Sequence, residues 1–193
     1  MSGTLVMLHG MSGTSEKMIP LANQLVPNDW EVYCPQATIS HPNLGGYAWW
    51  IKEEDDINYD NYVLQAYDSL TKLIEELPEG PLIVGGFSQG GAMASMMMER
   101  NIQDRILGLV LIGTMSINTL GLEVAMSNIW QRPVVWMHGE RDKIIPISVA
   151  EKHIKVFEKG GWKVIKLRHQ KGHMVDISQL DKLKTSIQSI VSQ

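Results

Sequence analysis

The sequence of 193 residues contains a single cysteine, Cys34, so no intrachain disulfide can form. It also lacks any apolar run that approaches the ~18 residues of a membrane-spanning helix, which predicts no integral membrane segment. No secretory signal is visible at the N-terminus, because no basic start is followed by a long apolar stretch. From these absences we expect a protein of the reducing cytoplasm.

Positive charge is also scarce. Seventeen Lys and Arg against 21 Asp and Glu give a formal net charge of −4, and no basic run occurs. Nucleic acids and anionic membranes attract basic surfaces, so we expect neither as a partner. The acidic segment KEEDD at 52–56 has no histidine at ligand spacing, which favours a solvated loop or helix start over a metal site. We expect neither a metal nor an organic cofactor.

What the sequence does contain is a regular alternation of two kinds of segment. Six short apolar runs bounded by turn residues predict strands, and most are continuously apolar, as in strands covered on both faces. Segments with helical spacing of apolar residues lie between them. The predicted strands cover residues 4–10, 31–36, 81–87, 106–113, 133–139 and 163–168.

Strands that alternate with amphipathic helices indicate βα units and a parallel sheet with right-handed crossovers. We therefore predict one three-layer α/β domain over residues 1–193, with helices on both faces of about six strands. The long connections 37–58 and 114–132 are too short for a second domain, and no large lid is expected. Ser15 is the expected cap of the first helix. His153 lies in a later helix-patterned stretch and is expected at the surface.

The segment GGFSQGGAMA at 85–94 places a serine between glycines two positions away on either side. A strand that turns directly into a helix strains the residue at the corner, and its neighbours two positions away must be small. Gly86 and Gly90 meet that need. The hydroxyl of Ser88 would then stand at the strand's carboxyl end as a nucleophile. The backbone N–H of Gln89 would face a developing oxyanion.

A serine hydroxyl is a poor nucleophile unless a histidine, oriented by a carboxylate, acts as its base. Of the six histidines, His173 follows the sixth predicted strand, so it shares the carboxyl edge of the sheet with Ser88. His169 is the next candidate on the residues alone. His9 and His138 each end a strand before a glycine and are more simply explained as loop-stabilising hydrogen-bond partners.

The carboxylate is expected from HGERDKIIP, which follows the fifth strand and offers Glu140 and Asp142. Asp142 lies beyond the glycine turn and is better placed to reach across to a histidine. On local grounds alone, a turn-capping aspartate explains Asp142 equally well. The second oxyanion donor is expected in HGMSGT, after the first strand, where the backbone N–H of Met11 is the candidate.

Together these residues resemble the phospholipase/carboxylesterase family of α/β-hydrolases, which includes the acyl-protein thioesterases. GFSQGGAMA is close to the family's nucleophile segment, LHG to its oxyanion loop, HGERDKIIP to its acid loop and the later GH to its base. The resemblance covers nearly the whole chain. It implies Ser88, Asp142 and His173 as a catalytic triad, Met11 and Gln89 as the oxyanion hole, and hydrolysis of carboxylic esters or thioesters through an acyl-serine intermediate.

The chain departs from the family in two respects that affect substrate preference more than chemistry. It begins directly at the first central strand, and residues 37–58 match the family only in part. Trp49, Trp50 and Met115 could line an acyl groove, although such side chains more often belong to a core.

The sequence leaves two other functions open. A ligand-binding or signalling protein could keep the hydrolase fold with little turnover, although a binder does not need all three triad groups. A related hydrolase or acyltransferase could act on lactone, amide or C–C bonds with the same residues. The expected partner is a small ester or thioester, and exposed loop tryptophans would allow a homodimer.

Overall fold

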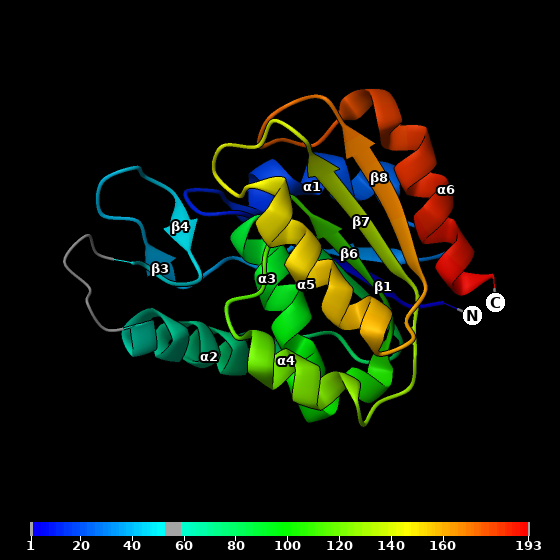
Figure 1. Ribbon diagram of the computed structural model, residues 1–193, viewed down its shortest axis with the longest axis horizontal. Coiled ribbons are helices and arrows are strands. Elements are labelled where there is room, and N and C mark those ends of the chain that lie inside the picture. The colour runs from blue at the N-terminus through cyan, green and yellow to red at the C-terminus, as the bar shows by residue number, and fades with distance from the viewer. Residues whose placement is uncertain (1, 53–58, 193) are drawn as a thin grey trace.

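The computed structural model describes residues 2–52 and 59–192. At its centre lies a six-stranded parallel sheet with the strand order β2-β1-β5-β6-β7-β8 (Figure 1). Each strand falls within or one residue beyond a predicted apolar run, so the predicted α/β fold with about six parallel strands is confirmed. The strands are β1 (Thr4–Leu8), β2 (Glu31–Tyr33), β5 (Leu82–Phe87), β6 (Ile106–Ile112), β7 (Val134–Gly139) and β8 (Val164–His169).

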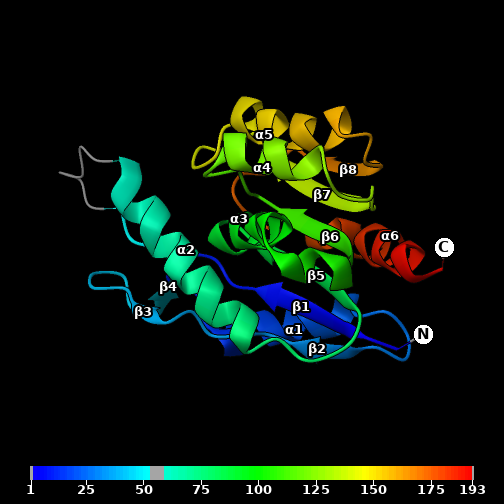
Figure 2. The same ribbon diagram turned by 90° about the horizontal axis from the view of Figure 1, so that it is seen from below.

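Helices cover both faces of this sheet (Figure 2). On one face α1 (Ser15–Leu25) and α6 (Leu180–Val191) share an apolar core with the strands. The other face carries α2 (Tyr59–Glu75), α3 (Gln89–Met96), α4 (Thr119–Met126) and α5 (Ile147–Lys159). Short 3-10 turns complete the chain at Met97–Glu99, Asn101–Arg105 and Ile177–Gln179. None of the helices in the described ranges is long and apolar enough to cross a membrane.

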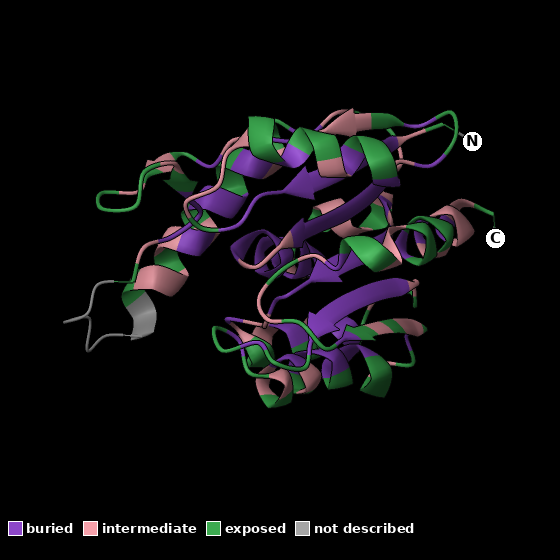
Figure 3. Cartoon of the chain, turned by 90° about the horizontal axis from the view of Figure 1, so that it is seen from above, coloured by how far each residue is buried: buried purple, intermediate pink, exposed green. Residues whose placement is uncertain are grey.

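The central strands are buried on both sides, as Figure 3 shows. In β1, Leu5 and Met7 belong to the core beneath α1 and α6, whereas Val6 and Leu8 belong to the opposite core. Successive side chains of a strand point to opposite faces, so a strand covered twice must be apolar at every position. This explains why the strand segments are uninterrupted apolar runs.

The connection at 37–58 contains a short antiparallel hairpin that the sequence did not predict, β3 (Ile39–Ser40) and β4 (Tyr47–Ala48). Gly46 has a φ of 66°, and a Cβ at this position would overlap the carbonyl oxygen of Ser12. The N–H of Tyr47 donates to the carbonyl of Gly13 at 3.0 Å. The hairpin is therefore fixed against the loop that follows β1. The predicted acidic loop at 52–56 lies outside the described residues except for Lys52.

Thr14, and not Ser15, caps α1. The Thr14 hydroxyl oxygen accepts from the N–H of Lys17 at 3.3 Å. Ser15 is already helical, and its hydroxyl donates to the carbonyl of Cys34. Cys34 is buried, as expected, and burial raises the pKa of its thiol to about 11.

The expectation that His153 lies at the surface is wrong. Its side chain is buried on the inner face of α5, in the same stripe as Ala150 and Phe157. Nε2 of His153 lies 2.9 Å from the hydroxyl of Ser95 on α3. Burial lowers the pKa of His153 to about 3. The His153 imidazole therefore makes a polar contact between α5 and α3.

This burial predicts a pH-dependent stability. The unfolded chain, with a histidine pKa of about 6.5, binds the His153 proton more readily than the folded protein. The free energy of unfolding should therefore fall by about 1 kcal/mol per pH unit from this group as the pH drops below 6.5. Urea unfolding at pH 7, 6 and 5 should show that His153→Gln removes this slope. Parallel pH profiles of the wild type and the variant would contradict the burial.

Candidate active site

Ser88 occupies the corner between β5 and α3 in a backbone conformation that L-residues rarely adopt, with φ 55° and ψ −119°. Its N–H donates to the carbonyl of Ile112 at 2.9 Å. Its own carbonyl accepts from the hydroxyl of Thr114 at 2.7 Å. The strained corner is thus held from the neighbouring strand β6 and the loop that follows it.

Two glycines make this corner sterically feasible. A Cβ on Gly86 would lie 2.5 Å from the carbonyl carbon of Gly90. A Cβ on Gly90 would overlap the carbonyl oxygen of Leu8 in β1. The helix therefore starts directly against the strands, and any side chain at these positions would push it away.

Asp142 and His173 come together from two different loops. Nδ1 of His173, between β8 and α6, lies 2.7 Å from Oδ2 of Asp142, after β7. The other carboxylate oxygen of Asp142 accepts from the N–H groups of Ile144 at 2.9 Å and Ile145 at 2.8 Å. Asp142 therefore caps its own turn, as the local sequence suggests, and also pairs with a histidine.

The environment of Asp142 keeps this carboxylate ionised. Burial alone raises the pKa of Asp142, but the N–H of Ile145 and the hydrogen bond with His173 outweigh it, so the pKa is lowered. A second histidine, His138, has Nε2 3.5 Å from the same carboxylate and 2.9 Å from the carbonyl of Ile145. Burial lowers the pKa of His138, which leaves this ring neutral.

His173 lies beside the serine corner. The ring of Phe87, the residue before Ser88, packs against the His173 imidazole with centroids 4.8 Å apart. Gly113, with φ 55°, gives these rings room: a Cβ there would lie 3.1 Å from the Phe87 ring and 3.6 Å from that of His173. Because Nδ1 is bonded to Asp142, Nε2 is the ring nitrogen left for another partner.

The remaining candidate histidines have structural partners. Nδ1 of His9 donates to the carbonyl of Gly10 at 2.7 Å, and its Nε2 accepts from the N–H of Ala37 at 3.1 Å. The prediction that His9 and His138 stabilise loops is confirmed. His169, the second candidate base, is buried, and its Nδ1 accepts from the N–H of Lys171 at 3.3 Å.

Gln89 has a role that its position in the motif did not reveal. Its side-chain oxygen accepts from the N–H of Trp49 at 3.1 Å, and its amide donates to the carbonyl of Trp50 at 2.9 Å. Nε1 of Trp49 in turn donates to the carbonyl of His9 at 2.8 Å. The first residue of α3 thereby joins the long connection to the loop after β1. The glutamine side chain beside the serine was the one feature of the sequence that could have indicated this contact.

A cavity of about 380 Å³ opens at Ser88, and we name it the Ser88 cavity. Both candidate oxyanion residues line it, as do Trp50 and Met115. Trp49 does not: its side chain is 2% exposed and packs beneath, against His9. The sequence predicts an open cleft walled by residues 37–58 and 114–119, and these segments contribute His41, Ile51, Lys52, Thr114 and Ile117 to the lining. The sequence did not identify Ala92, Ile144 and Ile145, which complete it.

The site brings together hydroxyl, imidazole, carboxylate and backbone amide groups. Within residues 2–52 and 59–192, no cluster of three or more His, Cys, Asp or Glu is arranged to hold a metal ion.

The close contacts of Gly90 predict that adding a single methyl group there strongly destabilises the fold. Gly90→Ala should lower the free energy of unfolding by about 1–3 kcal/mol, because β1 cannot yield to the new Cβ. Gly172→Ala is the matched control, since its Cβ would meet only the Arg141 carbonyl at 3.6 Å. Urea denaturation measures both. Equal stability of the two variants would contradict the tight contact at Leu8.

Comparisons with known proteins agree with this architecture. The family model of the alpha/beta hydrolase fold matches residues 3–127. Acyl-protein thioesterase 1 of Cryptococcus neoformans is 24% identical over 183 residues, which cover 85% of this chain and 76% of the fungal protein.

Solved structures give the same result for the fold. Esterase PE8 superposes with a TM-score of 0.81 at 21% identity, covering 97% of this chain and 92% of its own. Acyl-protein thioesterase 2 of Zea mays has a TM-score of 0.70 at 18% identity, covering 98% and 94%. The carboxylesterase of Bacillus cereus has a TM-score of 0.71 at 16% identity, covering 98% and 89%. This chain belongs to the alpha/beta hydrolase fold family and is a distant homologue of acyl-protein thioesterases and carboxylesterases.

Proposed function

We propose that this protein is a serine hydrolase that cleaves carboxylic esters or thioesters, with Ser88, Asp142 and His173 as its catalytic triad. The observation that carries the proposal is the strained serine corner beside a histidine whose Nδ1 lies 2.7 Å from a buried carboxylate. A strained conformation at a polar residue has a free-energy cost, and such strain concentrates at functional sites. The relatives named as esterases and thioesterases support the same reaction class.

In the proposed reaction, Nε2 of His173 takes the Ser88 proton as Oγ attacks the carbonyl carbon and the carbonyl electron pair moves to oxygen. Ionised Asp142 holds the ring by Nδ1–H and stabilises the imidazolium. When the intermediate collapses, the bond to the leaving oxygen or sulfur breaks, and that atom takes the proton from Nε2 of His173. Water then attacks the acyl-serine by the same steps.

The oxyanion would be held by the backbone N–H groups of Met11 and Gln89. Gln89 is the first residue of α3, where N–H groups lack helical partners and the helix dipole favours negative charge. Met11 and Gln89 both face the Ser88 cavity. A donor of this kind typically contributes about 2.7–4 kcal/mol of transition-state stabilisation.

The Ser88 cavity is the proposed acyl site. Its walls are mainly apolar, with Trp50, Ala92, Met115, Ile117 and Ile145 among the lining side chains. Burial of one CH₂ group contributes about 0.8 kcal/mol, which corresponds to about a fourfold gain in kcat/KM per carbon. Activity should therefore rise along a series of short to medium acyl chains and level off once the chain protrudes.

The nucleophile is tested by Ser88→Ala. The variant should lose at least about a thousandfold in p-nitrophenyl butyrate hydrolysis and all labelling by a fluorophosphonate probe, because the attacking oxygen is gone. Ser127→Ala, at the exposed serine that follows α4, is the control that should keep both properties. A folded wild type that neither reacts with the probe nor hydrolyses the ester would favour a ligand-binding protein instead.

The acyl site is tested by Met115→Ala. Loss of this wall should lower the ratio of kcat/KM for p-nitrophenyl hexanoate over the acetate by roughly fivefold, because the longer chain loses apolar contact. Leu64→Ala, at an exposed position on α2, should leave the ratio unchanged. If Met115→Ala also left it unchanged, the acyl chain would have to lie elsewhere.

A further inference from the structure

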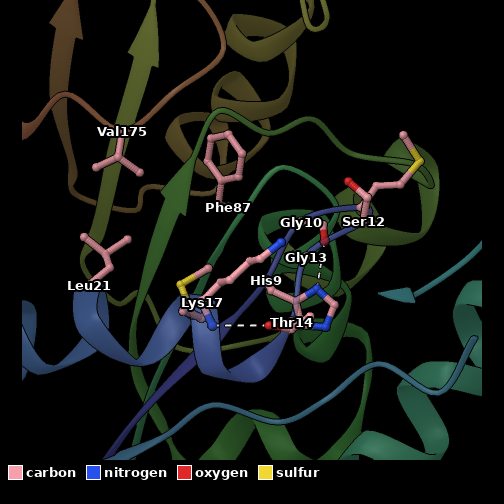
Figure 4. A pocket seen from close by; sticks show the side chains of 11 residues that line it. His9, Gly10, Ser12, Gly13, Thr14, Lys17, Leu21, Phe87 and Val175 are labelled. Atoms are coloured by element: carbon pink, nitrogen blue, oxygen red, sulfur yellow. Dashed lines mark hydrogen bonds between the residues drawn. The ribbon is translucent and has the colours of Figure 1, made fainter. Parts of the chain in front are cut away.

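A second cavity of about 290 Å³ lies beside the loop that follows β1 (Figure 4). It is lined by His9, Gly10, Met11, Ser12, Gly13, Thr14, Lys17, Met18, Leu21, Phe87 and Val175, and we name it the Lys17 cavity. Met11 lines this cavity and the Ser88 cavity alike. We propose that the Lys17 cavity receives the leaving group of the substrate and that Lys17 selects leaving groups that carry an anion. This inference rests on the proposed hydrolase function.

The Lys17 cavity lies on the same side of Ser88 as the proposed base, His173. The Phe87 ring in its wall packs against His173, and Val175 follows His173 by two residues. Gly10 brings the cavity close to the nucleophile, since a Cβ on Gly10 would lie 3.3 Å from Cβ of Ser88. A leaving group must take its proton from the imidazole, so it must depart on this side. The acyl group then occupies the Ser88 cavity.

The charge in the Lys17 cavity comes from one side chain. Lys17 is the only Lys or Arg among its lining residues, which include no Asp or Glu. His9 contributes no charge, because burial lowers its pKa and both ring nitrogens have backbone partners. In Figure 4 the Lys17 side chain extends across the cavity toward the loop at Gly10.

Among the residues that the structure describes, no carboxylate oxygen lies within 4.0 Å of the Lys17 ammonium group. Asp176, next to the lining residue Val175, is paired with Lys171 at 2.7 Å. The Glu16 carboxylate interacts with Thr14 and with its own backbone. Lys17 is therefore available for a ligand.

The walls define the rest of the ligand. Met18, Leu21, Phe87 and Val175 offer apolar surface in the same cavity as the cationic side chain. A fitting leaving group is an alcohol or thiol that combines a short apolar body with a carboxylate or phosphate. An anion that forms an ion pair with an exposed lysine such as Lys17 gains modestly, by about fivefold in affinity.

The test uses two esters with the same acyl group, 3-carboxyphenyl butyrate and 3-carbamoylphenyl butyrate, which differ mainly in the charge of the leaving group. In the wild type, kcat/KM should favour the carboxylate ester, and this preference should shrink at high salt. Lys17→Met keeps the chain length and removes the charge, so the ratio of the two kcat/KM values should fall about fivefold. Lys155→Met, at an exposed lysine on α5 across the sheet, should leave the ratio unchanged.

The two proposals fail in different ways. Turnover of the uncharged ester that Ser88→Ala abolishes would establish the hydrolase, and an unchanged ratio in Lys17→Met would then overturn only the assignment of Lys17. A wild type that hydrolyses neither ester would overturn the hydrolase proposal and the leaving-group site together. A drop in the ratio confined to Lys17→Met supports the leaving-group site.

Discussion

The contact between Gly90 of α3 and the carbonyl of Leu8 in β1 is the constraint on which the site depends. Because no side chain separates them, the helix begins where β5 ends, and Ser88 is forced to a φ of 55°. The corner presents the Ser88 side chain and the Gln89 amide at the carboxyl edge of the sheet. Displacement of α3 by an added methyl group would move both groups relative to His173, which is held at the same edge by the loops after β7 and β8.

Around this corner the polar contacts join segments that the sequence keeps far apart. Gln89 bonds the backbone at Trp49 and Trp50, and Trp49 bonds the carbonyl of His9. The corner, the loop after β1 and the long connection therefore form one hydrogen-bonded unit. Farther from the corner, the Tyr67 hydroxyl accepts from Asn118, the cap of α4, and donates to Glu99. These bonds hold the segment between β6 and α4, which carries Met115.

The two cavities agree with the geometry of acyl transfer. A tetrahedral carbon bonded to the serine oxygen carries an oxyanion, an acyl chain and a leaving group. The proposed oxyanion donor Met11 stands where the Ser88 cavity and the Lys17 cavity meet. The apolar cavity and the cationic cavity thus meet at this proposed donor, which would let substrate preference at each end change without altering the proposed triad.

Local patterns in the chain determined the strand segments, the parallel α/β fold and the spacing that made Ser88 a candidate, because continuous apolar runs and paired glycines act within a few residues. The catalytic roles themselves stay predictions. Tertiary structure decided what depends on distant neighbours. His153 is buried because α5 turns that side chain toward Ser95, and Trp49 is core while Trp50 lines a cavity. Burial and pairing are set by which elements pack together, and adjacent residues with the same side chain can therefore have opposite roles.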